Sequence, residues 1–237
     1  MRMSRALVID DGAAGESCSG SEAPMLVLGL CGRLGTGKDT VADILEAKHG
    51  FRRASFARAL KDVVAAAFGW DRDLLEGRTA ESRAWREQRD PFWSTALDIP
   101  ELTPRRALQV LGTDLVRERF HADFWLWALS QGIKQGKYGR RVVITDCRFE
   151  NEVAMVRGFG GTVVCVQRGS PPEWERALRA EGAAPPADVH QSEWAWMGSE
   201  DRSLDNNGTL DDLDKTICGM VGALASPSTA ADGGVLE

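Results

Sequence analysis

The sequence has few of the residues that mark metal, disulfide or membrane proteins. Only three histidines occur in 237 residues, and the five cysteines form no CxxC pair, so a structural zinc site is not expected. An odd number of unpaired cysteines is typical of buried thiols in a reducing compartment. The longest apolar run, residues 25–31, falls far short of the roughly 20 residues of a transmembrane helix. We therefore expect a soluble, intracellular protein of the cytoplasm.

An excess of positive charge is also lacking. Lys and Arg number 29 against 35 Asp and Glu, so no global positive field attracts nucleic acid or an anionic membrane. We expect neither as a partner. The length suits one α/β domain with a full core. Small and polar residues at both ends predict a disordered segment 1–24 and a flexible tail 225–237 around a domain at 25–224.

Within that domain, apolar runs typical of buried strands alternate with segments of helical spacing. The predicted strands are residues 25–30, 51–56, 141–145, 162–167 and 204–205. Predicted helices follow four of them, all but 162–167, and a long helix is predicted over 103–120; this alternation implies a parallel sheet. The segment 70–101 has little periodicity and is expected to be a surface excursion with short helical pieces.

A glycine-rich loop joins the first predicted strand to the first predicted helix. Gly32, Gly37 and Lys38 meet the G-x-x-x-x-G-K spacing, and Gly35 and Thr36 lie between them. Such a loop wraps phosphates with its backbone N–H groups, while the lysine and the helix N-terminus supply positive charge. We interpret it as the phosphate-binding loop of a nucleoside-triphosphate site, with an ordinary glycine turn as the alternative.

The residue after the loop lysine departs from the common motif. Asp39 stands where Ser or Thr is usual, and Thr40 follows it. We therefore expect the Thr40 hydroxyl to be the Mg²⁺ ligand, with Asp39 assisting through water. The alternative for Thr40 is a simple residue of the first helical turn.

A carboxylate and an arginine follow the third predicted strand. Asp146 ends that strand, where a carboxylate can hold water on the metal; its alternative is a helix cap. Arg148 would face the same crevice and bind an acceptor phosphate or stabilise the transferred group. Its alternative is an ion pair with Glu150 or Glu152. With Lys38, these two residues form the predicted catalytic set.

Four segments together resemble the deoxynucleoside monophosphate kinase family of bacteriophages and other viruses. They are GRLGTGKDTVAD at 32–43, LQVLGTDL at 108–115, TDCRFENE at 145–152 and NNGTLDDL at 206–213. The resemblance implies a three-layer P-loop kinase fold: a five-stranded parallel sheet with helices on both faces, an acceptor-binding helical region at about 70–135 and a lid at about 169–193.

The same resemblance implies roles for residues outside the loop. The acceptor side comprises Lys61, Arg83, Arg106, Gln109, Gly112, Thr113, Trp125 and Arg148. One amide can offer a donor and an acceptor to a base edge, which suits Gln109. Arg83 is one of several arginines at 78–89, and the choice among them is open. A solvated or packed helix face is the alternative for Arg106, Gln109 and Trp125.

The donor side of the nucleotide site is expected at the lid. The resemblance places Arg168, Asn206 and Asn207 beside the lid and the donor adenine. For the two asparagines, an ordinary Asn-Gly turn is the alternative.

The implied reaction moves the γ-phosphoryl group of ATP to a deoxynucleoside 5′-monophosphate, giving the diphosphate and ADP. The cofactor would be Mg²⁺, and the partners small-molecule nucleotides; a homodimer is left open. If the source is a virus, the location is the host cytoplasm. One alternative is another small-molecule P-loop kinase, acting on dephospho-coenzyme A, phosphomevalonate or a sugar acid. A second is a P-loop switch protein that binds ATP to control a partner.

Overall fold

The computed structural model describes residues 25–187, 189 and 191–225. The segment 1–24, predicted to be disordered, lies outside the described residues. Residues 226–237 of the predicted tail also lie outside them. Ala225 is the last residue of the final helix. No helix in the described part of the chain combines the length and the apolar character needed to span a bilayer.

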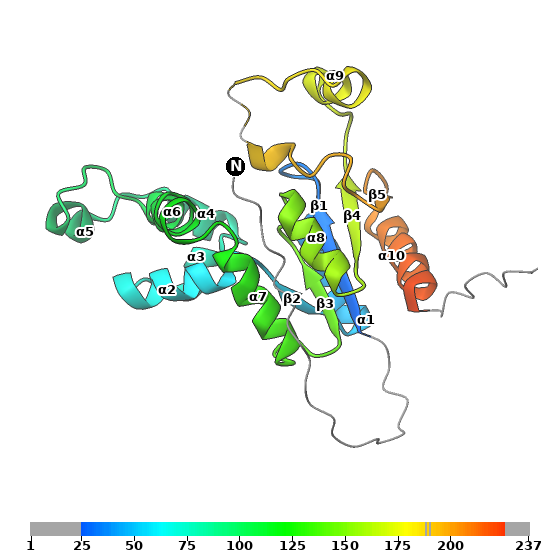
Figure 1. Ribbon diagram of the computed structural model, residues 1–237, viewed down its shortest axis with the longest axis horizontal. Helices are drawn as coiled ribbons and strands as arrows, with labels where there is room; N and C mark the ends of the chain where they lie inside the picture. Colours follow the sequence, from blue (N-terminus) through cyan, green and yellow to red (C-terminus); the bar gives the residue numbers. More distant parts are fainter. Residues whose placement is uncertain (1–24, 188, 190, 226–237) are drawn as a thin grey trace, which may run out of the picture.

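Five parallel strands form the centre of the molecule (Figure 1). They are β1 (Leu26–Cys31), β2 (Arg52–Ala54), β3 (Arg141–Ile144), β4 (Thr162–Gln167) and β5 (Arg202–Asp205). Their order in the sheet is β2-β3-β1-β4-β5, and every neighbouring pair is parallel. The predicted five-stranded parallel sheet is therefore confirmed.

Helices cover both faces of the sheet. These are α1 (Lys38–His49) and α10 (Leu210–Ala225) on one face, and α7 (Phe124–Lys134) and α8 (Glu150–Gly158) on the other. Side chains alternate along a strand, so Leu28 and Leu30 of β1 pack with the first pair of helices, whereas Val27 and Cys31 pack with the second. This sandwich confirms the predicted three-layer fold.

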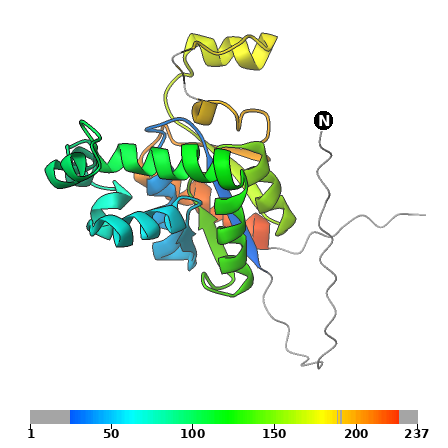
Figure 2. The same ribbon diagram turned by 60° about the vertical axis from the view of Figure 1, so that its left-hand side comes forward.

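A helical region projects beside the β2 edge of the sheet (Figures 1 and 2). It comprises α2 (Arg58–Phe68), α3 (Arg72–Glu76), α4 (Ala80–Arg86), α5 (Pro91–Ala96), α6 (Pro104–Gln109) and the π-helix η1 (Val110–Phe120). Leu60, Val64, Leu75 and Trp125 form its buried cluster. Gly112 permits the close packing, because a Cβ there would lie 2.5 Å from the Leu60 side chain.

Two parts of this region differ from the sequence prediction. The helix expected over 103–120 is α6 followed by the wider turns of η1, which hydrophobic spacing alone does not reveal. The predicted short helical pieces of 70–101 are α3, α4 and α5. Although α7 falls within the predicted acceptor-side range, its Leu129 and Ile133 pack in the core cluster of the sheet.

The lid range predicted at about 169–193 lies beyond the carboxyl ends of the strands, at the top of Figure 1. It contains α9 (Glu173–Glu181) and the short 3₁₀ helix η2 (Gln191–Glu193).

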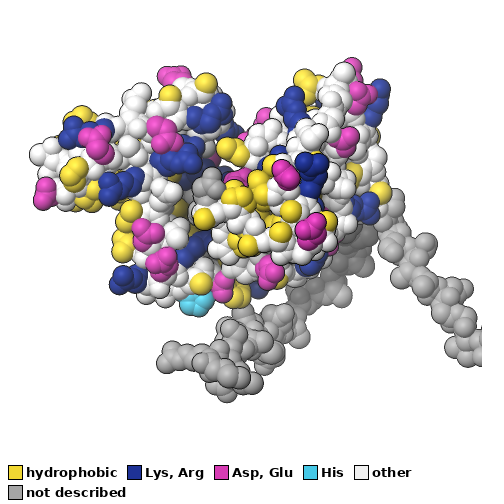
Figure 3. Space-filling view, turned by 90° about the horizontal axis from the view of Figure 1, so that it is seen from above, with side chains coloured by type: hydrophobic (Ala, Val, Ile, Leu, Met, Phe, Trp, Pro, Cys, Tyr) yellow, Lys and Arg dark blue, Asp and Glu magenta, His cyan; other side chains and the backbone are white. Residues whose placement is uncertain are grey.

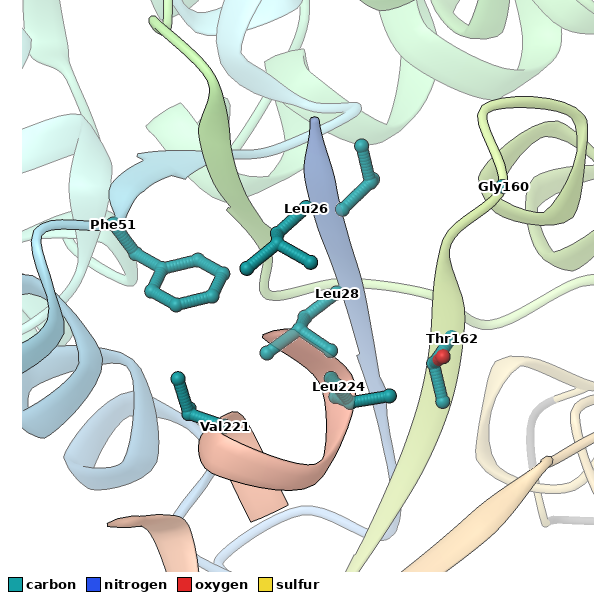
Figure 4. Close-up of a pocket in the computed structure, with 8 residues that line it drawn as sticks. Leu26, Leu28, Phe51, Gly160, Thr162, Val221 and Leu224 are labelled. Atoms are coloured by element: carbon teal, nitrogen blue, oxygen red, sulfur yellow. The ribbon is translucent and has the colours of Figure 1, made fainter. Parts of the chain in front are cut away.

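A small apolar cavity lies at the opposite, amino end of the strands (Figure 4). Its volume is about 50 Å³. The side chains of Leu28, Phe51, Val221 and Leu224 are among those that line it. It is far smaller than the few hundred cubic ångströms of typical ligand pockets, and it is a packing gap of the core.

Candidate functional site

The site lies at the carboxyl ends of β1 and β3. From β1 the chain continues to β2 on one side, whereas from β3 it crosses to β4 on the other side of β1. Ligands of open parallel sheets bind at such a reversal point. The phosphate loop follows β1 and Asp146 follows β3. Figure 3 looks down on this end and shows a hollow between the helical region and the lid.

The loop owes its shape to its glycines and to an asparagine that directly follows β5. Gly32, Gly35 and Gly37 have φ angles of 129°, 82° and 95°, which side chains disfavour. Asn206, 8% exposed, donates from Nδ2 to the Thr36 carbonyl at 2.9 Å. A Cβ on Gly37 would overlap that amide nitrogen. The loop backbone is thus determined by the conformations that its glycines permit and by the hydrogen bond from Asn206.

The loop lysine is held at the mouth of the loop. Lys38 Nζ donates to the carbonyls of Gly32 at 2.6 Å and Arg33 at 2.8 Å. Burial lowers the pKa of Lys38 from its usual value, and the nearby Arg148 guanidinium lowers it further. Two like charges brought this close to each other favour the arrival of an anion.

Asp146 faces the start of α2. Its Oδ2 accepts from Ser55 Oγ at 2.8 Å and from Ala57 N at 3.2 Å, and its Oδ1 accepts from Phe56 N at 3.0 Å. Ala57, at the N-cap position of α2, has no capping side chain, so Asp146 caps this helix from a different strand. A carboxylate has about four acceptor positions; one therefore remains for water or a ligand.

Arg148 extends toward the lid. Its Nη1 lies 4.0 Å from Glu193 Oε1 of η2. Glu193 Oε2 in turn accepts a hydrogen bond from the backbone N–H of Leu34 in the phosphate loop at 3.0 Å. The carboxylate of Glu193 thus lies between two groups that attract anions. The alternative partner Glu152 contacts the backbone N–H of Arg148 at 2.7 Å.

A metal cage of protein side chains is absent from the described residues, in which no three His, Cys, Asp or Glu side chains cluster suitably. Mg²⁺ commonly uses one or two protein ligands plus phosphates and water, so Thr40 and the open position of Asp146 fit it. Asp39, the expected helper, accepts from Arg53 Nη1 at 3.0 Å. Arg53 is buried and also pairs with Asp43 at 2.6 Å.

The lid is tied to the phosphate loop through Arg33. Its Nε lies 3.0 Å from Glu175 Oε2 of α9, and its Nη2 donates to the carbonyls of Arg168 at 3.1 Å and Ser170 at 3.4 Å. Asn207 Oδ1 accepts from the Gly169 N–H at 2.7 Å. The predicted donor-side residues Arg168, Asn206 and Asn207 therefore surround the base of the lid.

Most of the predicted acceptor residues lie on α6 and η1, which follow each other without a break, and on α7, which begins after the non-helical residues 121–123. Arg106 is exposed and donates to the Pro100 carbonyl at 3.0 Å; Gln109 and Thr113 are also exposed. Trp125 is 5% exposed, and its Nε1 donates to the Gly112 carbonyl at 3.0 Å. Gln109 and Thr113 are open to a ligand, whereas the ring of Trp125 packs in the core.

The two remaining acceptor candidates already have protein partners. Lys61 Nζ lies 2.7 Å from Glu76 Oε2, and Arg83 Nη1 donates to the Arg78 carbonyl at 2.9 Å. A hollow of about 510 Å³ lies close to them, lined by three arginines and three acids: Arg58, Arg72, Arg78, Asp62, Asp73 and Glu76. Its charges balance, so it offers no net attraction to a phosphate.

Several contacts of the site were not predicted from the sequence, although Arg33 and Glu193 lie in the predicted loop and lid. Glu193, Arg33 and Ser55 act through partners at distant positions in the chain. The sequence suggests Glu152 only as an alternative partner of the Arg148 side chain, and it assigns no role to Arg117, the ion-pair partner of Glu152. No local pattern marks these residues, because each contact depends on the folded arrangement of the strands.

The fold and the site together define a P-loop kinase. A phosphate loop with its lysine follows the central strand, and a carboxylate and an arginine follow the adjacent one. The sequence profile of the deoxynucleotide monophosphate kinase family matches residues 92–217, which is more than half of the chain. The chain belongs to this family, as its four motifs predicted.

Two viral relatives agree with the family. A protein of Acanthamoeba polyphaga mimivirus that carries the name of a deoxynucleotide monophosphate kinase is 31% identical over 61% of this chain and 75% of its own. A deoxynucleoside-5′-monophosphate kinase of Escherichia phage T5 is 27% identical over 56% of this chain and 72% of its own. This identity extends over most of each relative.

Solved structures give weaker likenesses. The dephospho-CoA kinase of Campylobacter jejuni is 14% identical with a TM-score of 0.43, covering 84% of this chain and 96% of that one. The shikimate kinase of Aquifex aeolicus is 13% identical with a TM-score of 0.41, covering 84% and 98%. Scores of this size support no conclusion about substrate.

Proposed function

We propose that this protein transfers the γ-phosphoryl group of ATP to the 5′-phosphate of a deoxynucleoside monophosphate, giving a deoxynucleoside diphosphate and ADP. The observation that carries the proposal is the placement of Lys38 after β1, and of Asp146 and Arg148 after the adjacent β3, in a chain of this family. The exposed Gln109 and Thr113 supply polar groups on the acceptor side.

The chemistry requires little beyond placement and charge. An oxygen of the acceptor phosphate forms the new bond to the γ-phosphorus, while the bond from that phosphorus to the β,γ-bridging oxygen breaks and ADP leaves. The acceptor is already an oxyanion at neutral pH, so no general base is needed. Positioning and electrostatic stabilisation carry the rate.

The residues divide these tasks. Lys38 neutralises the β- and γ-phosphate oxygens, and Arg148 stabilises the charge on the group in transfer. Thr40 and Asp146, the latter through water, would hold Mg²⁺, which would neutralise phosphate charge when bound. The lid segment that follows Arg168 excludes water, and so limits ATP hydrolysis.

An acceptor survey tests the proposal. ADP formation is coupled to NADH oxidation and measured with dGMP, dTMP, dCMP, dAMP, the ribonucleotides, dephospho-coenzyme A, phosphomevalonate and a sugar acid. We expect turnover with at least one deoxynucleoside monophosphate, together with formation of its diphosphate by chromatography. Turnover only with a non-nucleotide acceptor, or ATP hydrolysis that no monophosphate stimulates, would refute the proposal.

A further inference from the structure

Glu152 is a buried carboxylate that has no role in the proposed chemistry. It lies in the first turn of α8 and is 2% exposed. Its Oε2 accepts from the backbone N–H groups of Arg148 at 2.7 Å and Phe149 at 3.2 Å. Both amides belong to the turn that links β3 to α8, so this side chain fixes the backbone on which Arg148 stands.

The other oxygen of the same carboxylate reaches the acceptor-side helix. Glu152 Oε1 accepts from Arg117 Nη2 of η1 at 3.0 Å. The Arg117 guanidinium also lies 5.2 Å from the centre of the Phe149 ring, within the range of a cation–π contact. Arg117 therefore makes two contacts at the turn, an ion pair with Glu152 and a cation–π contact with the Phe149 ring.

The pair joins two parts of the site that are distant in sequence. Arg117 is on the same helix as Thr113, which is exposed and predicted to bind the acceptor. Glu152 is bonded to the turn that carries Asp146 and Arg148. A shift of η1 thus reaches the Arg148 backbone through two side chains.

Stability alone gives a poor account of the pair. A buried ion pair often contributes no more to folding than apolar side chains of the same size, because desolvation offsets the attraction. Burial and the nearby charge of Asp146 raise the pKa of Glu152 to about 7, against the opposing effect of the Arg148 amide and of Arg117. The position is costly for a carboxylate, and what the carboxylate provides is a fixed geometry.

We propose that Glu152 and Arg117 are positioning residues, which set the Arg148 turn against the acceptor helix η1 so that the bound monophosphate meets the γ-phosphoryl group in line. Neither residue contacts the substrate in this role. The inference rests on the proposed function and deepens it. It predicts that damage to the pair affects the use of the monophosphate more than the binding of ATP.

The test is kinetic and uses the full chain. Glu152→Gln keeps the shape and one amide acceptor but loses the charge that holds Arg117; Arg117→Gln removes the other partner. A displacement of about 1 Å in a reacting group can cost about a hundredfold in rate. We expect each variant to lose at least about tenfold in kcat/KM for the monophosphate, with KM for ATP within about twofold of the wild type.

The double variant and a neighbouring carboxylate supply the controls. Because both changes break one contact, Glu152→Gln combined with Arg117→Gln should lose less than the sum of the single losses in log kcat/KM. Glu150→Gln changes an exposed carboxylate in the same helical turn and should leave kcat and both KM values unchanged. Thermal melting and circular dichroism measure the folded fraction of each protein.

The outcomes separate the two proposals. If the wild type phosphorylates no deoxynucleoside monophosphate, the proposed function fails. If the wild type is active and the folded variants match it in kcat/KM for the monophosphate, with only a lower melting temperature, the pair is structural and the inference is overturned. A KM for ATP that rises by as large a factor as kcat/KM for the monophosphate falls overturns it as well. Should Glu152→Gln not fold, the partly exposed Arg117 decides the question through Arg117→Gln alone.

Discussion

The carboxylate of Glu193 accepts a hydrogen bond from the backbone N–H of Leu34 at 3.0 Å, which brings a negative charge from the lid onto the phosphate loop. Its other oxygen lies 4.0 Å from Arg148 Nη1, and its charge raises the pKa of Lys38 in opposition to burial. A triphosphate that enters the loop meets this charge. The lid residue and the nucleotide therefore compete for the same positive groups.

Neutralising this carboxylate should strengthen ATP binding. One unit charge at about 4 Å is worth about 1 kcal/mol in water, so Glu193→Gln should lower the Kd for a non-hydrolysable ATP analogue about fivefold, measured by calorimetry. Glu181→Gln, an exposed carboxylate at the end of α9, should leave the Kd unchanged. Weaker binding by Glu193→Gln would show that the carboxylate holds the loop in its binding shape.

Removal of the loop lysine should abolish turnover. Lys38→Ala deletes the charge that neutralises the phosphates, and we expect kcat to fall about 10³-fold or more. Lys48→Ala is the matched control, because Lys48 is a lysine of the same helix whose exposed ion pair with Asp214 contributes little. Steady-state kinetics with saturating acceptor measure both. Retained turnover in Lys38→Ala would show that the nucleotide is bound elsewhere.

A methyl group on Gly37 should block the loop through steric overlap. Gly37→Ala and Gly50→Ala both place a side chain at positive φ, which costs about 1 to 2 kcal/mol. At Gly50 nothing lies within 4 Å of the added atom, whereas at Gly37 it overlaps the Asn206 amide. Both variants should lose similar stability in urea unfolding, and only Gly37→Ala should lose ATP binding. Equal ATP affinity in the two would contradict the importance of the Asn206 contact.

Asp146 caps α2 and is expected to bind the metal, and a substitution of Ser55, its hydroxyl partner, tests these two roles separately. Asp146→Asn removes the charge from the metal site, so kcat should fall about 10²-fold along with stability. Ser55→Ala removes a hydrogen bond to Asp146 Oδ2 and keeps the charge, so it should cost about 1 kcal/mol of stability and little rate. Urea unfolding and Mg²⁺ titration of kcat measure the two effects. If Asp146→Asn and Ser55→Ala lowered kcat by the same factor, Asp146 would act only as the cap of α2.

The sequence predicted the parts of this site that depend on local patterns. Glycine spacing and the adjoining apolar run located the loop through Gly37 and Lys38, and a β-branched run ending in Asp146 located the second part. The contacts of Glu193 and Arg117 could not be predicted, because they depend on how the lid and η1 pack after folding. The predictions for individual acceptor and donor residues remain to be tested.

The ion pairs of Glu76 should contribute to the decrease of the unfolding free energy at acid pH. Burial alone would raise the pKa of Glu76, but Lys61 and then Arg72 outweigh it and hold that pKa at about 2, against an ordinary value of 4.5. A depressed folded-state pKa gives stability that is present above pH 4.5 and is lost as pH falls toward 2. Glu76→Gln should therefore flatten the pH dependence of the unfolding free energy between these values.

Glu87→Gln is the control for this decrease at acid pH. Its ion pair with Arg105 is exposed on both sides, and such pairs contribute about 0 to 1 kcal/mol. Thermal melts between pH 2 and 7 compare the variants with the wild type. A decrease at acid pH as steep in Glu76→Gln as in the wild type would assign the acid sensitivity to other carboxylates.

The contact between Arg33 and Glu175 has a bearing on the order of catalytic events. Arg33 is part of the loop that would hold the donor phosphates, so the lid helix is fastened to the same few residues as the nucleotide. In the proposed reaction, opening of the lid would therefore pull on the loop itself and would couple the departure of ADP to the release of the lid. If release of the lid limits turnover, the contacts of Arg33 and Glu193 between the lid and the loop would together set the rate.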